Sequence, residues 1–240
     1  FWNSTEYVLY MYDGGNTSSS GITGLSGFSA SANLTVQGSA SGDSMNLNID
    51  RSSDLTGNLT LNMGAGNDNF YSAKLKNGDS VDMGAGDDSV SIMATGSNGT
   101  PTIANLNLTK LDGGAGSDTL QFEESGSNTT ELTLTTGGAT NFENIIGTSG
   151  AETIKGDANA NKLEGKGGND TLYGYANNDT LEGDGGDDIL YGGTGNDWIS
   201  PGNGADAAHG GGGDDFLIGR TGWDTLYGNA GQDTLYGSDG

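Results

Sequence analysis

Acidic side chains recur at intervals of nine residues over the last 94 residues of this 240-residue chain. Carboxylate oxygens are the ligands that hard cations such as calcium prefer. The chain has no cysteine and one histidine, so the ligands of softer metals such as zinc are missing. The spacing therefore predicts repeated binding of a hard cation by oxygen ligands. The side chains at this place of the repeat are Glu152, Asn161, Asp170, Asp179, Asp188, Asp197, Asp206, Asp215, Asp224 and Asp233.

Ten nonapeptides run without interruption from Gly147 to Tyr236, each with glycine near its start and an aliphatic residue usually at its eighth place. The first six places are rich in Gly and Asn, which tolerate positive φ, and the last three favour a strand. Each nonapeptide is predicted to be a turn plus a short strand, with two nonapeptides per 18-residue coil. This arrangement predicts an all-β parallel β-solenoid with two inward ladders, Leu172, Leu190 and Ala208 in one sheet and Leu181, Ile199 and Leu217 in the opposite one.

Residues 1–146 do not follow the uninterrupted nine-residue period. A loop is predicted over 14–32, and short alternating segments then indicate strands: NLTVQ, MNLNID, NLTLNM, DSVDM, DSVSIM, NLNLTKL, TLQF and ELTLT. Copies of the turn motif occur at Gly64–Phe70, Gly84–Val90 and Gly113–Gln121, with their aspartates 20 and 30 residues apart. We expect residues 1–146 to form an irregular, capping β-solenoid and residues 147–240 to form a regular β-roll.

Composition limits what the chain binds. The net charge is −24, which excludes nucleic-acid backbone binding as a default and favours a cationic partner. Only 32% of residues are hydrophobic and 46 are glycine, so the strands bury too little to hold the fold alone. No apolar stretch reaches membrane-spanning length, and no targeting segment is visible.

The tandem nonapeptides resemble the G-G-x-G-x-D-x-U-x repeat of RTX, or hemolysin-type, calcium-binding proteins. The segment that leads into them, from Leu111 onward, is similar to RTX regions of bacterial S-layer proteins and large adhesins. The resemblance implies calcium between the turns of successive coils, bound by sixth-place carboxylates and by carbonyls of the glycine-rich turns. The implied metal-binding residues are Asp170, Asp179, Asp188, Asp197, Asp206, Asp215, Asp224 and Asp233, with Gly168, Gly186, Gly195, Gly204, Gly213 and Gly222, and Asp68, Asp88 and Asp118 upstream.

Pairing each sixth-place Asp with the one 18 residues on gives six complete acidic pairs, from 170/188 to 215/233. The 16 acidic and 4 basic residues of 147–240 leave a net charge of −12, which six calcium ions would balance. One or two further ions are expected upstream. Weaker or absent metal is expected where the pattern departs from the repeat, at Glu152, Asn161, Tyr175, Asn177 and Pro201.

The function expected is that of a calcium-dependent structural domain of a large, type I secreted bacterial surface protein, such as an S-layer, filament or adhesin stalk. It would be disordered at low calcium and fold outside the cell. The alternative is a non-catalytic accessory or polysaccharide-binding module of a secreted lipase, protease or epimerase. HExxH and GxSxG motifs are absent, and we expect no enzyme. Gly42-Asp43-Ser44 with Asp206 and His209 imitates a GDS hydrolase, but Asp206 falls in the calcium register.

Two columns of aromatic residues are expected on the outer surface. Tyr173, Tyr191, His209 and Tyr227 share the ninth place, and Trp198 and Phe216 share the seventh. Such a column stabilises a sheet through its own cross-strand contacts, or it stacks sugar rings or docks another protein. Self-association and a cell-surface polysaccharide therefore both stay open as partners.

Overall fold

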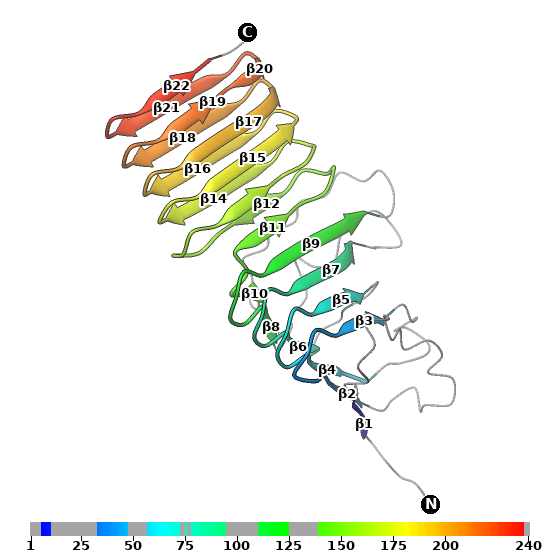
Figure 1. The fold of residues 1–240 in the computed structure, drawn as a ribbon. Coiled ribbons are helices and arrows are strands. Elements are labelled where there is room, and N and C mark those ends of the chain that lie inside the picture. Colours follow the sequence, from blue (N-terminus) through cyan, green and yellow to red (C-terminus); the bar gives the residue numbers. More distant parts are fainter. Residues whose placement is uncertain are drawn as a thin grey trace, which may run out of the picture. The chain divides into compact units, whose positions relative to one another are not determined.

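Parallel strands stacked into coils make up the fold (Figure 1). The computed structural model describes residues 6–10, 33–47, 57–72, 75, 78–94, 110–124 and 139–237. Strand is the only regular secondary structure in these residues. The predicted all-β parallel solenoid is therefore confirmed. The loop expected over 14–32, the segment ELTLT and most of the segment NLNLTKL lie outside the described residues. Of the described residues, those up to 121 and 139–142 belong to one compact unit, and 122–124 and 143–237 belong to a second.

In the first unit the chain alternates between two parallel sheets. One sheet has the order β1 (Glu6–Tyr10), β2 (Asn33–Gln37), β4 (Leu59–Asn62), β6 (Ser80–Asp82), β8 (Lys110–Asp112) and β10 (Ala139–Thr140). The other has the order β3 (Ser44–Leu47), β5 (Asn69–Ser72), β7 (Ser89–Ala94) and β9 (Thr119–Glu124).

Inward side chains of the first unit form two buried ladders. Val36, Leu61, Val81 and Leu111 lie in register in one sheet, and Met45, Phe70, Val90 and Leu120 are buried in the other. One coil here takes 20 to 30 residues, because the connections after β3, β5, β7 and β9 differ in length. The irregular solenoid expected before the regular repeats is therefore present.

The second unit has the expected 18-residue coil. One sheet has the order β11 (Asn144–Ile146), β13 (Lys162–Glu164), β15 (Thr180–Gly185), β17 (Trp198–Gly204), β19 (Phe216–Ile218) and β22 (Thr234–Tyr236), with β20 (Arg220–Gly222) also on β17. The other has β12 (Thr153–Lys155), β14 (Thr171–Ala176), β16 (Ile189–Thr194), β18 (Ala207–Gly212) and β21 (Thr225–Ala230). The two predicted aliphatic ladders lie in register and are fully buried.

Several strands of the second unit are longer than the three residues expected from the repeat. Pairing continues past the first place into the second and third, as at Tyr175↔Gly193 and Ala176↔Thr194. The turn proper is therefore shorter than six residues. β17 pairs with β19 before Pro201 and with β20 after it. First-place N–H groups elsewhere donate to the ninth-place carbonyl one coil on, as Gly165 does to Glu182 at 2.8 Å, and proline has no N–H to donate.

A neighbouring pair of glycines tests the stacking of the turns. Gly213 has φ +128, and a Cβ there would lie 2.0 Å from the Gly195 carbonyl oxygen, whereas a Cβ on Gly212 meets nothing within 4 Å. We expect Gly213→Ala to lower the free energy of unfolding in calcium by about 2 kcal/mol or more, because left-handed backbone and a backbone clash both oppose it. Gly212→Ala should change it by less than about 0.5 kcal/mol. Urea unfolding followed by circular dichroism measures both, and equal losses would contradict the turn geometry.

Candidate metal centre

Sixth-place aspartates form a hydrogen-bonded ladder in which each coil is joined to the next. The Asp170 N–H donates to Oδ1 of Asp188 at 2.7 Å, and the Asp188 N–H donates to Oδ1 of Asp206 at 2.8 Å. On the opposite edge Asp179, Asp197 and Asp215 repeat the pattern at 2.8 and 2.9 Å. Asp224 and Asp233 accept from the preceding coil at 3.2 and 3.0 Å. All eight predicted aspartates of the regular roll therefore lie in two continuous ladders.

In seven of these eight aspartates the second carboxylate oxygen is buried and has no hydrogen-bond partner. Six of the eight aspartates are 1–2% exposed, yet their Oδ2 atoms are buried and accept no hydrogen bond; the full set in the roll is Asp170, Asp179, Asp188, Asp197, Asp206, Asp215 and Asp224. A buried polar atom without a partner costs about 1–3 kcal/mol, and more when charged. Each ladder thus holds a row of bare anionic oxygens.

First-place glycines let a backbone carbonyl approach these bare oxygens. A Cβ on Gly192 would lie 2.3 Å from Oδ2 of Asp197 and 2.7 Å from the carbonyl oxygen of Gly210, one coil on. The same holds at Gly174, with 2.4 Å to Asp179 Oδ2 and 2.6 Å to the Gly192 oxygen. A carboxylate oxygen and a carbonyl oxygen therefore converge at each turn, and such a set of oxygens without nitrogen or sulfur suits a hard cation.

The fourth-place glycines predicted to line the sites hold the turns close together. All have positive φ, between +103° and +153°, and a Cβ on any of them would lie 1.5–2.1 Å from the carbonyl oxygen at the same place one coil earlier; they are Gly168, Gly186, Gly195, Gly204, Gly213 and Gly222. Tyr175 and Asn177, which replace turn glycines, adopt φ 79° and 69°. The turn backbone therefore survives both substitutions.

Burial raises the pKa values of the ladder carboxyls. Removal from water is the largest cause, neighbouring carboxylates add to it, and the hydrogen bond from the preceding coil opposes it. The pKa of Asp170 rises to about 8, that of Asp179 to about 7, and those of Asp188 and Asp197 to about 6. The pKa values of Asp206 and Asp215 also rise. Without a counter-cation, the folded ladder disfavours the ionised carboxylate.

The upstream turn copies carry the same ladder. The Asp68 N–H donates to Asp88 Oδ1, and the Asp88 N–H donates to Asp118 Oδ1, both at 2.8 Å. All three aspartates are buried, the Oδ2 atoms of Asp68 and Asp88 accept no hydrogen bond, and burial raises the pKa of Asp68 to about 7. The three upstream residues singled out from the sequence therefore lie together in one column.

Two further members of the upstream ladders were missed in the sequence. The Asp43 N–H donates to Asp68 Oδ1 at 2.6 Å, and Asp79, fully buried, accepts from the Leu59 N–H at 2.9 Å. Asp43 belongs to GSASGDSM, where serine and alanine replace most turn glycines, so the repeat pattern hides it. The sequence feature that could have identified Asp43 and Asp79 is the Asp-Ser pair that precedes an alternating strand at both positions.

Glu152 and Asn161, which depart from the Asp pattern, use their side chains differently from the later aspartates. Both donate their N–H to the ladder, to Asp170 and Asp179. However, Glu152 Oε2 accepts from Thr148 N–H and Asn161 Oδ1 accepts from Asp157 N–H, both within their own turns. These side chains close their own turns, whereas Oδ1 of the later aspartates accepts from the preceding coil.

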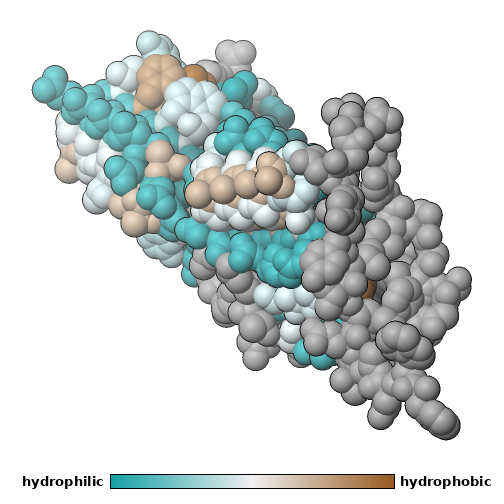
Figure 2. All heavy atoms as spheres, turned by 60° about the horizontal axis from the view of Figure 1, so that its bottom comes forward, coloured by the Kyte–Doolittle hydropathy of each residue, from teal (hydrophilic) through white to brown (hydrophobic). Residues whose placement is uncertain are grey.

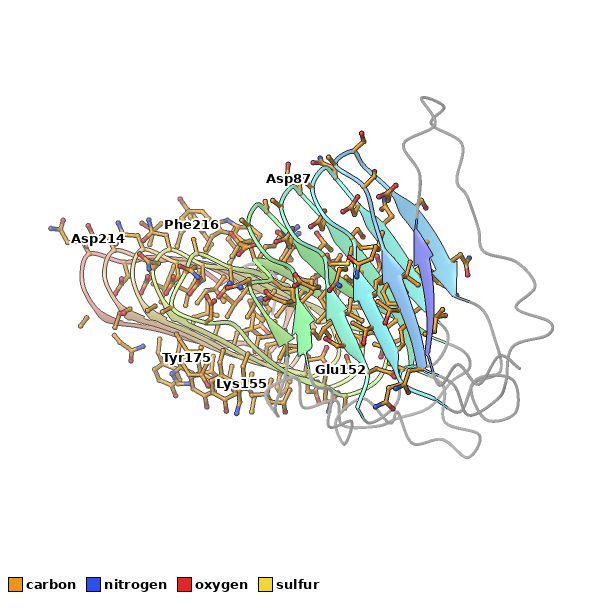
Figure 3. The ribbon with its side chains drawn as sticks, turned by 90° about the horizontal axis from the view of Figure 1, so that it is seen from below. Asp87, Glu152, Lys155, Tyr175, Asp214 and Phe216 are labelled. Atoms are coloured by element: carbon orange, nitrogen blue, oxygen red, sulfur yellow. The ribbon has the colours of Figure 1, made fainter. Side chains whose placement is uncertain are left out.

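A second ladder at the fifth place was also missed. Asn169 Oδ1 accepts from the Asp187 N–H at 3.0 Å, and Asp187 Oδ1 accepts from the Ala205 N–H at 2.9 Å. Asn196, Asp214 and, upstream, Asp87 act in the same way, and Figure 3 labels Asp87 and Asp214. Recurrent Asn or Asp at the fifth place was the available signal. This ladder is exposed and runs opposite to the sixth-place ladder, so each coil is fixed from both sides.

The ninth-place aromatic residues stack on one another. Ring centroids of Tyr173, Tyr191, His209 and Tyr227 are 5.0, 4.9 and 4.7 Å apart with interplanar angles of 8–11°. Lys155 Nζ lies over Tyr173, on the side of the roll where Figure 3 labels Lys155 and Tyr175. The rings of Tyr191 and His209 are covered on both faces by their neighbours, so the column forms a cross-strand stack whose inner rings offer only their edges to a ligand.

The residues that imitate a GDS hydrolase have other places in the fold. Asp43 and Asp206 are ladder members, and His209 lies between two tyrosine rings. Among the described residues no cluster of three or more His, Cys, Asp or Glu side chains could hold a metal ion. The turns instead bring a buried aspartate Oδ2 near a carbonyl oxygen of the next coil, as at Gly174 and Gly192.

Comparison with protein families matches this geometry. The RTX calcium-binding nonapeptide repeat is found in four copies over residues 146–181, 173–208 and 209–240. Residues 146–240 are RTX repeats. RTX repeats bind calcium and form structural domains of secreted proteins. No curated protein matches the chain. No helix among the residues that the structure covers could span a membrane.

The raised pKa values predict how the metal-free RTX repeats respond to pH. A carboxyl whose pKa is higher in the fold than its usual 3.8 stabilises the fold below pH 4, and this stability is lost as the pH rises through about 6 to 8. Calcium-stripped protein should therefore show more β-structure by far-UV circular dichroism at pH 4.5 than at pH 8. Calcium-loaded protein should not lose stability over this range. Metal-free protein that becomes more stable toward pH 8 would contradict the buried ladder.

Proposed function

We propose that this chain is a calcium-dependent structural domain of a large secreted bacterial cell-surface protein, such as an S-layer protein, a filament or an adhesin stalk, and that it is not an enzyme. The observation that carries the proposal is the row of buried Oδ2 atoms without partners. These oxygen atoms recur from coil to coil, so the proposed calcium sites are distributed along the length of the roll. A chain built this way gains stiffness from metal at each step.

The calcium ligands in this proposal are the sixth-place carboxylates and carbonyl oxygens of the glycine turns. Neighbouring carboxylates one coil apart share an ion, which gives six ions for six Asp pairs and neutralises the −12 charge of residues 147–240. Asp68, Asp88 and Asp118 would hold one or two more. Bound calcium supplies positive charge to oxygens that water does not reach. We assign the turn glycines Gly168 to Gly222 a role in presenting carbonyls, and residues 147–240 a role as the regular calcium-binding domain.

Folding and metal binding are coupled in this account. Without calcium the ladder must bury ionised carboxylates beside one another or protonate them, and the one-residue-deep ladders of the roll compensate little. A chain that stays unfolded at low calcium suits type I export from the cytoplasm. Millimolar calcium outside the cell would then fill weak sites.

The alternative, an accessory module of a secreted enzyme, needs a ligand-binding surface rather than a lattice. The stacked ninth-place column is a poor candidate for that surface, because both faces of Tyr191 and of His209 are covered by neighbouring rings. On the face shown in Figure 2, hydrophilic residues lie between narrow apolar rows, and no broad apolar surface is exposed there.

Calcium titration tests the proposed role. Calcium-stripped protein at pH 7.5 should show little β-structure by far-UV circular dichroism and convert to β-structure cooperatively as calcium is added. Light scattering in the same cell should rise if the domain self-associates as a lattice or filament. Conversion to β-structure without a rise in light scattering would favour a monomeric stalk or an accessory module over a lattice or filament. β-structure that persists when bound metal is shown to be absent would overturn the calcium-folding role.

Substitutions at the neighbouring residues Asp187 and Asp188 test whether the buried sixth-place carboxylate, and not net charge alone, binds calcium. Asp188→Asn keeps an Oδ1 acceptor for the Asp170 N–H but removes the bare anionic oxygen, which two neighbouring sites would share. We expect it to lower the number of bound calcium ions by one or two in equilibrium dialysis. Asp187→Asn makes the same charge change at the exposed fifth place, where Asn169 and Asn196 already occur, and should leave the number unchanged. Equal effects would mean that net charge alone governs binding.

A further inference from the structure

An open groove lies on the outer side of the sheet that contains β15, β17 and β20. It has a volume of about 340 Å³, at the small end of the range for small-molecule sites. Three successive coils line it, with Asp184, Gly202 and Arg220 in register and Gly185, Asn203 and Thr221 beside them. The lining residues are Glu182, Asp184, Ser200, Gly202, Asn203, Arg220 and Thr221.

A gap in the side-chain columns creates the groove. The second place carries charged side chains at Lys166, Asp184 and Arg220, but glycine at 202, and the ninth place changes from Glu182 to the smaller Ser200 in the same coil. The missing side chains leave a hollow one coil wide. Acidic residues form the wall on one side, and Arg220 with Thr221 forms the wall on the other.

The two charged walls do not pair with each other. Arg220 Nε donates to Ser200 Oγ, which orients the guanidinium, and within the described residues Arg220 makes no ion pair. Asp184 is exposed and likewise makes no ion pair there, while Glu182 meets Lys162 at 3.5 Å. The groove thus presents the carboxylates of Asp184 and Glu182 as acceptors on one side and the remaining guanidinium N–H groups of Arg220 as donors on the other, with the Asn203 amide able to do both.

Two half-buried aromatic side chains, Trp198 and Phe216, lie on the same face. Trp198 precedes Ser200 by two residues on β17, with fully buried Ile199 between them, and Trp198 lies in register with Phe216. Figure 3 labels Phe216 on the side of the roll opposite Lys155 and Tyr175. Unlike the ninth-place rings, Trp198 is not part of the face-to-face stack. A half-buried tryptophan beside mixed donors and acceptors matches a ligand with both hydroxyls and apolar C–H faces.

We propose that this groove binds one or two sugar residues of a neutral glycan chain, with Arg220 and Asn203 donating to hydroxyl oxygens and Glu182 and Asp184 accepting from hydroxyl groups. Neutral sugars fit because the lining contains two carboxylates against one guanidinium, so the groove itself carries a net negative charge and a uronate would be repelled. The open groove suits a chain that enters and leaves it. This site goes beyond the structural role and requires only that the roll be folded.

Amide chemical shifts of ¹⁵N-labelled full chain in saturating calcium test the site, with cellobiose and lactose as neutral probes and galacturonate and glycylglycine as ionic ones. Millimolar neutral disaccharide should shift amides of residues 182–185, 200–203 and 220–221. Arg220→Asn should weaken this binding tenfold or more. Asn229→Asp makes the same charge change at the second place of the other sheet and should not alter it. Asn229 has φ 70 and Arg220 has φ 69, so asparagine fits the backbone at 220.

Other outcomes overturn the assignment. Shifts caused only by galacturonate or glycylglycine would replace the neutral glycan with an ionic ligand. Shifts confined to the ninth-place column, or no shifts with any probe, would mean that the groove is only a gap between coils. Because the chain is folded in every sample, these results are independent of whether calcium drives folding.

Discussion

A buried carboxylate with one oxygen hydrogen-bonded and the other bare is the constraint on which this structure depends. Oδ1 of each sixth-place aspartate joins its coil to the preceding one, so the residue cannot leave the turn without breaking the ladder. Oδ2 is then held away from water beside a carbonyl oxygen of the next coil. The thin aliphatic ladders cannot offset a row of such anions, and a divalent cation can, because it binds the oxygens that the fold leaves over.

The other places of the nonapeptide serve this arrangement. Glycine at the fourth place allows turns to stack with carbonyl oxygens nearly touching the next Cα, and left-handed backbone at the second place is taken by glycine, asparagine or longer residues such as Lys166. The fifth-place ladder runs opposite to the sixth-place ladder and fixes the coil register from the solvent side. The turns of the first unit keep both ladders, while the connections between its strands vary in length. The hydrogen-bonded ladders and the glycine turns, and not the coil length, are thus the features that the two units share.

Period and residue type predicted the coil, the two aliphatic ladders and the grouping of the aspartates, because a strict nine-residue register leaves few alternatives. The sequence could not show that Oδ1 and Oδ2 have different partners, since this depends on the backbone of another coil. Asp43 and Asp79 were missed because their turns lack most of the glycines. The sequence left open whether the aromatic column stacks on itself or on sugars, and the structure shows that its rings stack on one another. The groove arises from Ser200 and Gly202, two small residues whose effect depends on the side chains one coil away.

The most direct test of the account is a crystal structure of the chain grown in calcium, with anomalous scattering used to locate the metal. The account predicts ions about 2.3–2.6 Å from the Oδ2 atoms of sixth-place aspartates such as Asp188 and Asp197, with the Oδ1 hydrogen bonds of the ladder kept. Ions bound only at exposed fifth-place carboxylates such as Asp187 and Asp214, with the buried Oδ2 atoms still bare, would contradict it.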